Sequence, residues 1–230
     1  MKDLKITRDD VYKINLKLSK SSLVIQNFGN ASARSANGFV IKPSGIDLEM
    51  YSPKDMVEMD LSGKVINGSL KPSSDEPTHR ILYSENKEIN GIVHTHSKFA
   101  TAFAQANIQI ENFGTTHSDF SKFPIFVTDQ LSENQVEIDY EKNTGIKILE
   151  KLKDEKVNIM ETPGILSIRH GVFSWGETIT QALDNAEIIE YIAEICILTK
   201  TLNPNSETIE KFIAKKHFDR KHGPNKYYGQ

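Results

Sequence analysis

Two histidines at the end of an apolar segment are the residues of this sequence best suited to chemistry. His94 and His96 follow Gly91-Ile92-Val93, whose residue types favour a buried strand. Side chains of a strand alternate between its two faces, so His94 and His96 are expected to point to the same side. Two neutral imidazoles on one side can share a metal ion such as Zn²⁺. The spacing also fits a second interpretation, in which two histidines simply occupy the polar end of a strand.

Further candidate ligands lie elsewhere in the chain. His170 follows a second apolar segment, and Gly171 after it would let the backbone turn where a site opens. Asp75 precedes an expected helix and could supply a carboxylate, although a role as the helix N-cap explains it nearly as well. His79 is expected to be structural rather than a ligand. Spacing alone does not select among these residues.

Three turns rich in glycine, serine and lysine call for a separate explanation. They are Gly29-Asn30-Ala31-Ser32, Lys42-Pro43-Ser44-Gly45 and Lys71-Pro72-Ser73-Ser74. Each could be no more than a turn, but together they offer backbone N–H groups, hydroxyls and cations, and the last lies at the start of an expected helix. These groups favour an anion such as phosphate. Because the glycine spacings of nucleotide-binding loops do not occur, a small phosphoester is a better candidate than a nucleotide.

Hydrophobic periodicity and turn residues indicate the elements that would position these side chains. Helices are expected at residues 8–25, 99–106, 139–153, 178–201 and 207–217, and a further helix is expected to start after Asp75. Strands are expected at residues 39–41, 57–61, 65–66, 91–96, 125–127, 165–168 and 172–175, the second and third as a hairpin. This mixture predicts an α/β protein whose sheet is covered by helices on both faces.

The composition narrows the class of protein. The 230 residues are 38% hydrophobic and 26% charged, as in soluble globular proteins, and no linker-like segment divides them, so one domain is expected over residues 1–230. The net charge of −3 offers no basic surface for nucleic acid. The charged first segment, which includes Lys2, Asp3 and Lys5, lacks the apolar run of a signal peptide or membrane helix. A cytoplasmic protein without a membrane partner is therefore expected.

Taken together, these motifs resemble those of the class II aldolase family, in particular its L-ribulose-5-phosphate 4-epimerase branch. The resemblance runs from about Gly29 to the last residue and keeps the order and approximate spacing of the family's motifs. The motifs are Lys42-Pro43-Ser44-Gly45, Lys71-Pro72-Ser73-Ser74-Asp75, Gly91-Ile92-Val93-His94-Thr95-His96-Ser97, Gly114-Thr115-Thr116-His117, Arg220-Lys221-His222-Gly223 and Tyr227-Tyr228-Gly229-Gln230.

Two departures from the family pattern concern the rim of the pocket. Relatives often carry Cys-Thr-Arg where this sequence has Val127-Thr128-Asp129, and Thr-Trp where it has Asn27-Phe28. Neither change removes a ligand of the motifs.

The resemblance implies both a site and a fold. It implies a divalent ion, with zinc as the first candidate, and a phosphate group, with Asp119 and Tyr228 as proton-transfer residues. Tyr228 would enter the site of an adjacent subunit, which implies a homotetramer. The implied fold is a three-layer α/β/α arrangement with a central, largely antiparallel sheet. The implied ligands of the ion are Asp75, His94, His96 and His170, and those of the phosphate are Asn30, Ser44, Gly45, Ser73 and Ser74.

The implied activity is the interconversion of L-ribulose 5-phosphate and D-xylulose 5-phosphate, which inverts C4. The hydrogen on C4 is not acidic, because C4 is one carbon beyond the position next to the C2 carbonyl. Breaking and re-forming the C3–C4 bond is therefore a better route than deprotonation. An aldolase that releases the two fragments is an alternative. A phosphosugar-binding or metal-binding module without catalysis is another, although it leaves Asp119 and Tyr228 without a role.

Overall fold

A seven-stranded antiparallel sheet forms the centre of this computed structural model, which describes residues 7–224, 226 and 227. The strand order is β4-β3-β2-β1-β5-β7-β6. Strands β1, β5 and β7 are therefore neighbours in the middle of the sheet, although they are far apart in the sequence. The strands are β1 (Gly29–Ser35), β2 (Gly38–Ile41), β3 (Val57–Met59), β4 (Val65–Asn67), β5 (Gly91–Thr95), β6 (Gly164–Ser167) and β7 (Gly171–Gly176).

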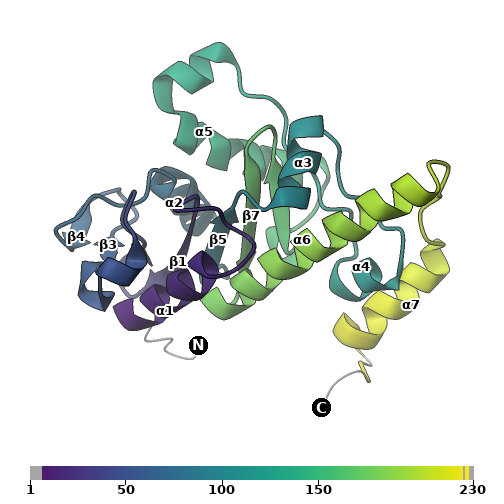
Figure 1. Cartoon of the computed structure of the whole chain (residues 1–230), viewed down its shortest axis with the longest axis horizontal. Coiled ribbons are helices and arrows are strands. Elements are labelled where there is room, and N and C mark those ends of the chain that lie inside the picture. The colour runs from purple at the N-terminus through teal and green to yellow at the C-terminus, as the bar shows by residue number, and fades with distance from the viewer. Residues whose placement is uncertain (1–6, 225, 228–230) are drawn as a thin grey trace.

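Helices cover both faces of this sheet (Figure 1). The α-helices are α1 (Arg8–Ser19), α2 (Glu76–Glu85), α3 (Lys98–Ala106), α4 (Thr115–Phe120), α5 (Glu133–Asp154), α6 (Ile179–Leu202) and α7 (Lys211–His222). Short 3₁₀ helices occur at Leu48–Met50, Pro53–Asp55 and Ile159–Glu161. Within the described part of the chain, no helix is long and apolar enough to cross a membrane.

The core is divided by the sheet into two sides. Leu82 of α2 and Ile148 of α5 pack with Ile92 of β5 on one side. On the other side, Val93 of β5 packs with residues of α1 and α6, among them Val11. Neighbouring residues of β5 thus serve opposite cores, as strand geometry requires. The expected three-layer α/β/α class with a central antiparallel sheet is confirmed.

The expected turn at residues 29–32 is wrong, because these residues begin strand β1. The segment lacks the bulky β-branched and aromatic residues that usually identify a strand. It is held instead by contacts from a distant helix: Asn15 of α1 donates to the Ala31 carbonyl (2.9 Å) and accepts from the Ala31 N–H (2.8 Å). A small residue at Ala31 lets α1 approach the sheet closely enough for both bonds.

Several expected element boundaries also differ. The first helix ends at Ser19 rather than residue 25; the Ser21 hydroxyl donates to the Leu18 carbonyl, and Ile25 is exposed. Residues 125–127 make only isolated bridges, not a strand. Helix α5 starts at residue 133 instead of 139, with a non-helical residue, Asp139, inside it (φ −167°, ψ 87°). The last helix covers Lys211–His222 rather than 207–217.

Candidate metal centre

Three imidazoles converge beside the C-terminal end of β5. His94 lies in β5, His96 follows it, and His170 lies between β6 and β7. One ring nitrogen of each lies within 4.8 Å of the others, and the Nε2 atoms of His94 and His96 are 3.1 Å apart. Ligands placed tetrahedrally at zinc–nitrogen distances stand about 3.3 Å from one another. The spacing of these rings therefore fits one shared ion.

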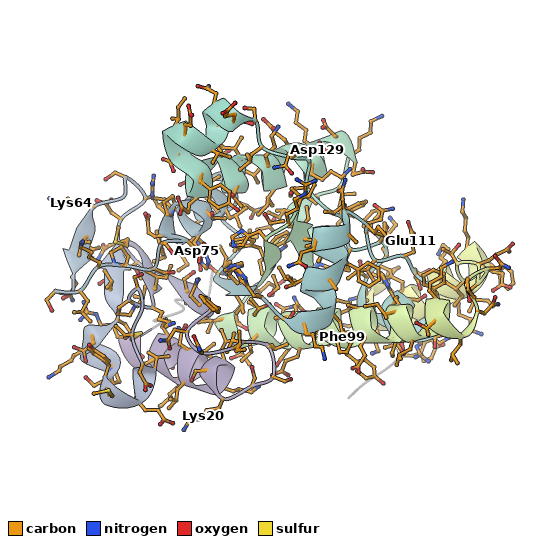
Figure 2. All side chains as sticks on the ribbon, turned by 45° about the horizontal axis from the view of Figure 1, so that its top comes forward. Lys20, Lys64, Asp75, Phe99, Glu111 and Asp129 are labelled. Carbon is orange, nitrogen blue, oxygen red and sulfur yellow. The ribbon has the colours of Figure 1, made fainter. Side chains whose placement is uncertain are left out.

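The side chain of Asp75 faces this cluster instead of capping α2. Asp75 is the N-cap residue of α2, but its carboxylate makes no capping hydrogen bond. Its Oδ2 accepts from Asn30 Nδ2 (2.7 Å) and lies 4.0 Å from His94 Nε2. Figure 2 shows Asp75 toward the middle of the molecule, and the residue is half-buried. The carboxylate is thus available as a fourth ligand, and the N-cap interpretation does not account for it.

The protonation states of the cluster suit a cation. Burial, followed by the effect of His94, lowers the pKa of His170 to about 3. Burial also lowers the pKa of His96. Burial raises the pKa of Asp75, but the neighbouring imidazoles and the hydrogen bond from Asn30 more than offset this, and the pKa lies below its ordinary value. The lowered pKa values favour neutral rings at His96 and His170 beside an ionised Asp75, and neutral imidazoles with a carboxylate form a donor set that suits a divalent ion such as zinc.

The orientation of His94 is set by a backbone carbonyl and an aromatic ring. His94 Nδ1 donates to the Val172 carbonyl oxygen (2.9 Å), so a neutral His94 would present the lone pair of Nε2 toward the cluster. The Phe173 ring stacks on the imidazole, with centroids 4.2 Å apart. Metal-binding histidines are commonly oriented by such a hydrogen bond to a carbonyl.

Gly171 was expected to allow a turn, but the structure gives it a different role. The left-handed residue between β6 and β7 is Arg169 (φ 55°), whereas Gly171 begins β7. A Cβ atom at Gly171 would lie 2.4 Å from the Thr95 carbonyl oxygen and 3.3 Å from atoms of the His94 and His96 rings. Glycine is therefore needed here for close approach of β7 to β5, not for the turn.

The two loops expected to bind phosphate lie side by side. Ser44 N donates to the Lys71 carbonyl (3.0 Å), and Ser73 N donates to the Lys42 carbonyl (2.9 Å). Ser44, Gly45 and Ser74 are exposed, whereas Ser73 is buried. Gly45 has a left-handed conformation (φ +64°), which explains glycine at this position. Hydroxyls and N–H groups at the N-terminus of α2 are thus gathered near Asp75, as anion binding requires.

The structure qualifies one expected phosphate contact, that of Asn30, and shows a buried cation, Lys42, that was not singled out as a site residue from the sequence. The amide of Asn30 is bonded to Asp75, and its strand neighbour across the sheet is His94. Lys42 is buried, and its Nζ donates to the carbonyls of Asn27 (3.3 Å) and Gly29 (3.2 Å). Burial lowers the pKa of Lys42, partly offset by the charge of Asp75. Its position in the Lys-Pro-Ser-Gly motif was the available signal.

Asp119 lies outside the histidine cluster. Its carboxylate accepts from Arg220 Nε (2.8 Å) and Nη2, and it lies 3.0 Å from His217 Nδ1. Figure 1 shows α4 and α7, which carry these residues, at one end of the molecule, whereas α2 lies in the other half. Tyr228 lies outside the described residues. Asp119 is therefore not brought together with the three histidines of its own chain.

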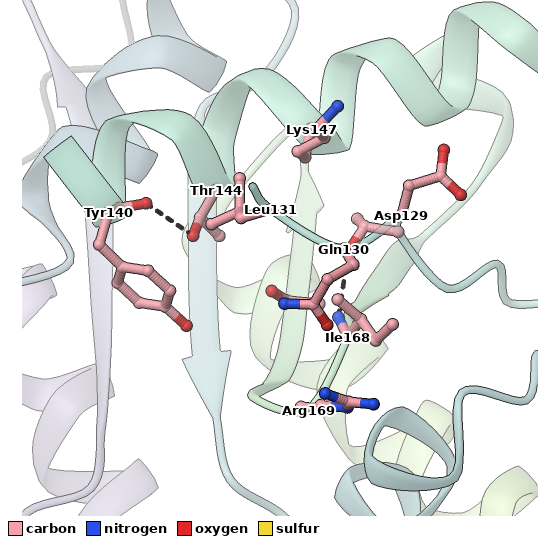
Figure 3. Close-up of a pocket in the computed structure, with 10 residues that line it drawn as sticks. Asp129, Gln130, Leu131, Tyr140, Thr144, Lys147, Ile168 and Arg169 are labelled. Atoms are coloured by element: carbon pink, nitrogen blue, oxygen red, sulfur yellow. Dashed lines mark hydrogen bonds between the residues drawn. The ribbon is translucent and has the colours of Figure 1, made fainter. Parts of the chain in front are cut away.

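A small cavity beside His170 was not predicted. It has a volume of about 90 Å³ and is lined by residues that include Gln130, Tyr140 and Arg169 (Figure 3). The rings of Tyr140 and His170 lie 5.9 Å apart. Tyr140 directly follows the irregular residue Asp139, so its direction depends on a kink in α5 that no sequence pattern indicated. At the histidine cluster itself, the exposed Phe28 ring stacks on the ring of His96, with centroids 6.1 Å apart.

Solved structures with this fold come from sugar-phosphate aldolases and related proteins. An L-fuculose 1-phosphate aldolase has a TM-score of 0.77 and 22% identity, covering 93% of this chain and 95% of its own. YgbL from Escherichia coli has a TM-score of 0.72 and 18% identity, covering 92% and 97%. The L-fuculose-1-phosphate aldolase of Thermus thermophilus has a TM-score of 0.65 and 20% identity, covering 86% and 96%.

The sequence itself gives the family. The model of the "Class II Aldolase and Adducin N-terminal domain" matches residues 9–197, which is most of the chain. This chain belongs to the class II aldolase and adducin N-terminal domain family.

Proposed function

We propose that this protein is a metal-dependent L-ribulose-5-phosphate 4-epimerase, which interconverts L-ribulose 5-phosphate and D-xylulose 5-phosphate. Family membership supports an enzyme acting on a phosphorylated sugar, since relatives with this fold include L-fuculose 1-phosphate aldolases. The convergence of three imidazoles and a carboxylate supports metal dependence.

His94, His96, His170 and Asp75 would hold the ion, and zinc suits this combination of nitrogen and oxygen donors. When bound, the ion supplies positive charge near substrate oxygens that become negative during the reaction. The exposed loops at Ser44 and Ser74 would hold the phosphate at the N-terminus of α2. The substrate would then lie between a phosphate site and a cation site, with its reacting carbons in the middle.

The reaction follows from the low acidity of the C4 hydrogen. A base removes the proton of the C4 hydroxyl, the C3–C4 bond breaks, and its electrons move toward C2. The products are a three-carbon enediolate and glycolaldehyde phosphate. The aldehyde rotates, C3 adds to its other face, and an acid returns a proton to the C4 oxygen. Because that oxygen points to opposite sides before and after rotation, one proton carrier is needed on each side.

Asp119 and Tyr228 are the proposed proton carriers. The position of Asp119 indicates which copy of the chain they would serve. Asp119 lies at the α4–α7 end of the molecule, and the N–H of Tyr227 donates to the Arg220 carbonyl (3.0 Å) at the same end. Asp119 would therefore serve the metal centre of a neighbouring copy, and we propose the same role for Tyr228. This requirement supports the proposed homotetramer with sites between subunits.

The observation that favours an epimerase rather than an aldolase is the short side chain of Asp75. It is bonded to Asn30 and lies 4.0 Å from His94 Nε2. A carboxylate held in this way would remain with the ion, whereas a longer Glu could reach out and protonate the enediolate. Without that protonation, re-addition competes better than release. A class II aldolase that cleaves a phosphorylated ketose is the second candidate, favoured by the named relatives.

The test is incubation of the metal-loaded protein with L-ribulose 5-phosphate, followed by separation of the products. D-Xylulose 5-phosphate without free fragments is expected. Glycolaldehyde phosphate with dihydroxyacetone would instead identify an aldolase. Binding of the sugar phosphate without either product, after addition of Zn²⁺, Co²⁺ or Mn²⁺, would reject both enzymes in favour of a binding module.

A further inference from the structure

A seam of polar side chains runs through the core between α2 and β1. Asp75, His79 and Tyr83 follow one another at intervals of four residues, which places them on one face of the helix. Asn30 and Ser32 alternate along β1 and share the face of the sheet that α2 covers. We call these five residues the polar seam. One end of the polar seam is the carboxylate of Asp75, the proposed metal ligand, and the other end is Tyr83 in the core.

The members of the polar seam are joined by short hydrogen bonds. Asn30 Nδ2 donates to Asp75 Oδ2 at 2.7 Å. Ser32 Oγ lies 2.6 Å from His79 Nδ1 and 2.8 Å from the Tyr83 hydroxyl. His79, Tyr83 and Ser32 are completely buried. A polar group buried in this way is costly unless it is paired, so a helix that only needed to cover the sheet would carry apolar residues here.

The hydrogen bonds fix the tautomer of His79. Among the described residues, the Tyr83 hydroxyl has Ser32 Oγ as its only acceptor, so the phenol donates to Ser32. The single hydrogen of Ser32 then goes to His79 Nδ1. The imidazole therefore carries its own hydrogen on Nε2. Burial lowers the pKa of His79 to about 3, which agrees with a neutral ring.

Two buried atoms of the polar seam have no partner in the part of the chain that the structure describes. They are His79 Nε2, a donor, and Asn30 Oδ1, an acceptor. His79 lies one helical turn after Asp75, whose carbonyl accepts from the His79 N–H (3.2 Å). An unpaired buried donor beside a candidate metal centre calls for a functional explanation.

We propose that His79 is a positioning residue of the metal centre. Its Nε2–H, set by the Tyr83–Ser32 chain and without another partner among the described residues, would donate to the Asp75 carboxylate when an ion is bound and hold it in the orientation that binds the ion. This inference rests on the metal centre of the proposed function and adds a residue that the three-histidine cluster does not include. Groups that orient metal ligands typically change metal affinity roughly 10- to 100-fold when they are replaced.

Two substitutions separate this role from a purely structural one. The amide of His79→Asn reaches the position of Nδ1 and keeps the bond to Ser32 but removes the donor at Nε2. The longer amide of His79→Gln reaches the position of Nε2. The probe is Co²⁺, titrated into metal-free protein and followed by its visible absorption, together with thermal unfolding. We expect His79→Asn to bind Co²⁺ roughly 10- to 100-fold more weakly than the wild type, and His79→Gln to stay within about threefold.

Thr78→Val is the matched control on the same helix. Thr78 is buried, and its hydroxyl donates to the Glu141 carbonyl (2.5 Å) toward α5 rather than toward the metal centre. This variant should lower the melting temperature without weakening Co²⁺ binding. If both His79 variants bind Co²⁺ as the wild type does and only melt earlier, the seam is structural and the proposal is overturned. Weak binding by His79→Gln with tight binding by His79→Asn would overturn it as well.

A second pair of variants keeps the test decisive if His79 variants do not fold. Ser32→Ala removes the group that fixes the tautomer, and we expect it to weaken Co²⁺ binding several-fold. Ser174→Ala removes a buried hydroxyl that donates to the Ala182 carbonyl (2.8 Å) on the other face, and its affinity should not change. Equal affinities in this pair would reject the role of the seam. A wild-type protein that binds no Co²⁺ would instead reject the metal centre itself, and this inference with it.

Discussion

Gly171 determines how closely β7 approaches the strand that carries His94. We predict that Gly171→Ala separates the two strands, because its Cβ would lie 2.4 Å from the Thr95 carbonyl oxygen. The free energy of unfolding should fall by about 1–3 kcal/mol, as in other overpacked sites. His170, in the adjoining turn, should move relative to His94, so Co²⁺ binding should weaken strongly. Chemical denaturation and Co²⁺ titration measure the two effects.

Gly114→Ala is the control for this substitution. A Cβ at Gly114 would meet no atom within 4 Å, and the residue has extended backbone, which any amino acid adopts. It should leave both stability and Co²⁺ affinity nearly unchanged. A Gly171→Ala protein that binds Co²⁺ with wild-type affinity would show that the histidines do not depend on this close approach.

At the scale of single residues, strand alternation predicted that His94 and His96 share one side, and the structure places them 3.1 Å apart at Nε2. His170 could be proposed but not placed, because its position depends on the pairing of β7 with β5, which joins distant segments. The role of Asp75 could not be decided from the sequence either. An N-cap residue and a residue that faces a neighbouring strand have the same local sequence signature.

The second prediction concerns phosphate binding by the serine residues at the start of α2. We predict that Ser74→Ala raises KM for the sugar phosphate roughly tenfold, the effect of losing one hydrogen bond to a charged group, with little change in kcat. Inhibition by inorganic phosphate should weaken by a similar factor. Ser84→Ala, at an exposed position near the other end of the same helix, should change neither. Unchanged KM and phosphate inhibition in Ser74→Ala would place the phosphate elsewhere.

At the scale of elements, the start of α6 was predicted within one residue, and Thr178 at its N-cap accepts from the Gln181 N–H (3.1 Å). The start of α5 was missed, although Ser132 caps it in the same way. Strand β1 was missed because its small polar residues carry no local signal, and the contacts that hold it come from α1 and β5. The break at Asp139 involves no glycine or proline; the Asp139 carboxylate accepts from the Lys142 N–H (3.1 Å) and so caps the second part of α5.

Asp119 joins α4 to α7, and this leads to a prediction about pH. Burial raises the pKa of Asp119, but the hydrogen bonds from Arg220 and His217 more than offset this, and the pKa falls below its ordinary value. A lowered pKa in the folded protein contributes stability above the unfolded pKa of about 3.9 and loses it as the pH falls through the folded pKa. We therefore expect Asp119→Asn to lower the free energy of unfolding by about 1.5–3 kcal/mol at pH 7.

The difference in the free energy of unfolding between the wild type and Asp119→Asn should become smaller below about pH 4, where the wild-type carboxylate becomes protonated and loses its charge. Urea denaturation at a series of pH values measures it. Asp219→Asn, which removes an exposed carboxylate paired with Lys215 on α7, should have little effect at any pH. A constant difference between wild type and Asp119→Asn from pH 7 to pH 3 would contradict the ionic role of Asp119.

At the scale of the whole molecule, the described residues of one chain do not complete the proposed site. The histidine cluster lies beside β5, whereas Asp119 is held by α7 at another end of the molecule. Sequence motifs revealed both groups of residues but could not indicate which chain each would serve. The proposed site, shared between copies, would account for both placements.

Exchange of subunits between two inactive variants tests this arrangement. We predict that Tyr228→Phe folds, binds Co²⁺ and substrate, and loses most epimerisation, because a phenol that donates a proton to the C4 oxygen has no substitute. His96→Asn should be inactive for lack of metal. If Tyr228 serves a neighbouring copy, mixed oligomers contain some interfaces with both an intact metal centre and an intact tyrosine. Mixing under conditions that exchange subunits should then restore part of the activity.

The amount restored is itself informative. If each site combines the metal centre of one chain with Tyr228 of one other chain, random equal mixing leaves about one site in four with both wild-type groups, so about a quarter of wild-type activity should return. If the tyrosine acted within its own chain, every site would lack one group and the mixture would stay inactive. Full activity of Tyr228→Phe alone would instead remove the tyrosine from the mechanism and leave the second proton carrier to be found among other residues. Mixing His96→Asn with Asp119→Asn tests in the same way whether Asp119 acts in a neighbouring copy. Because Asp119 is held beside Arg220, we expect the same recovery of activity.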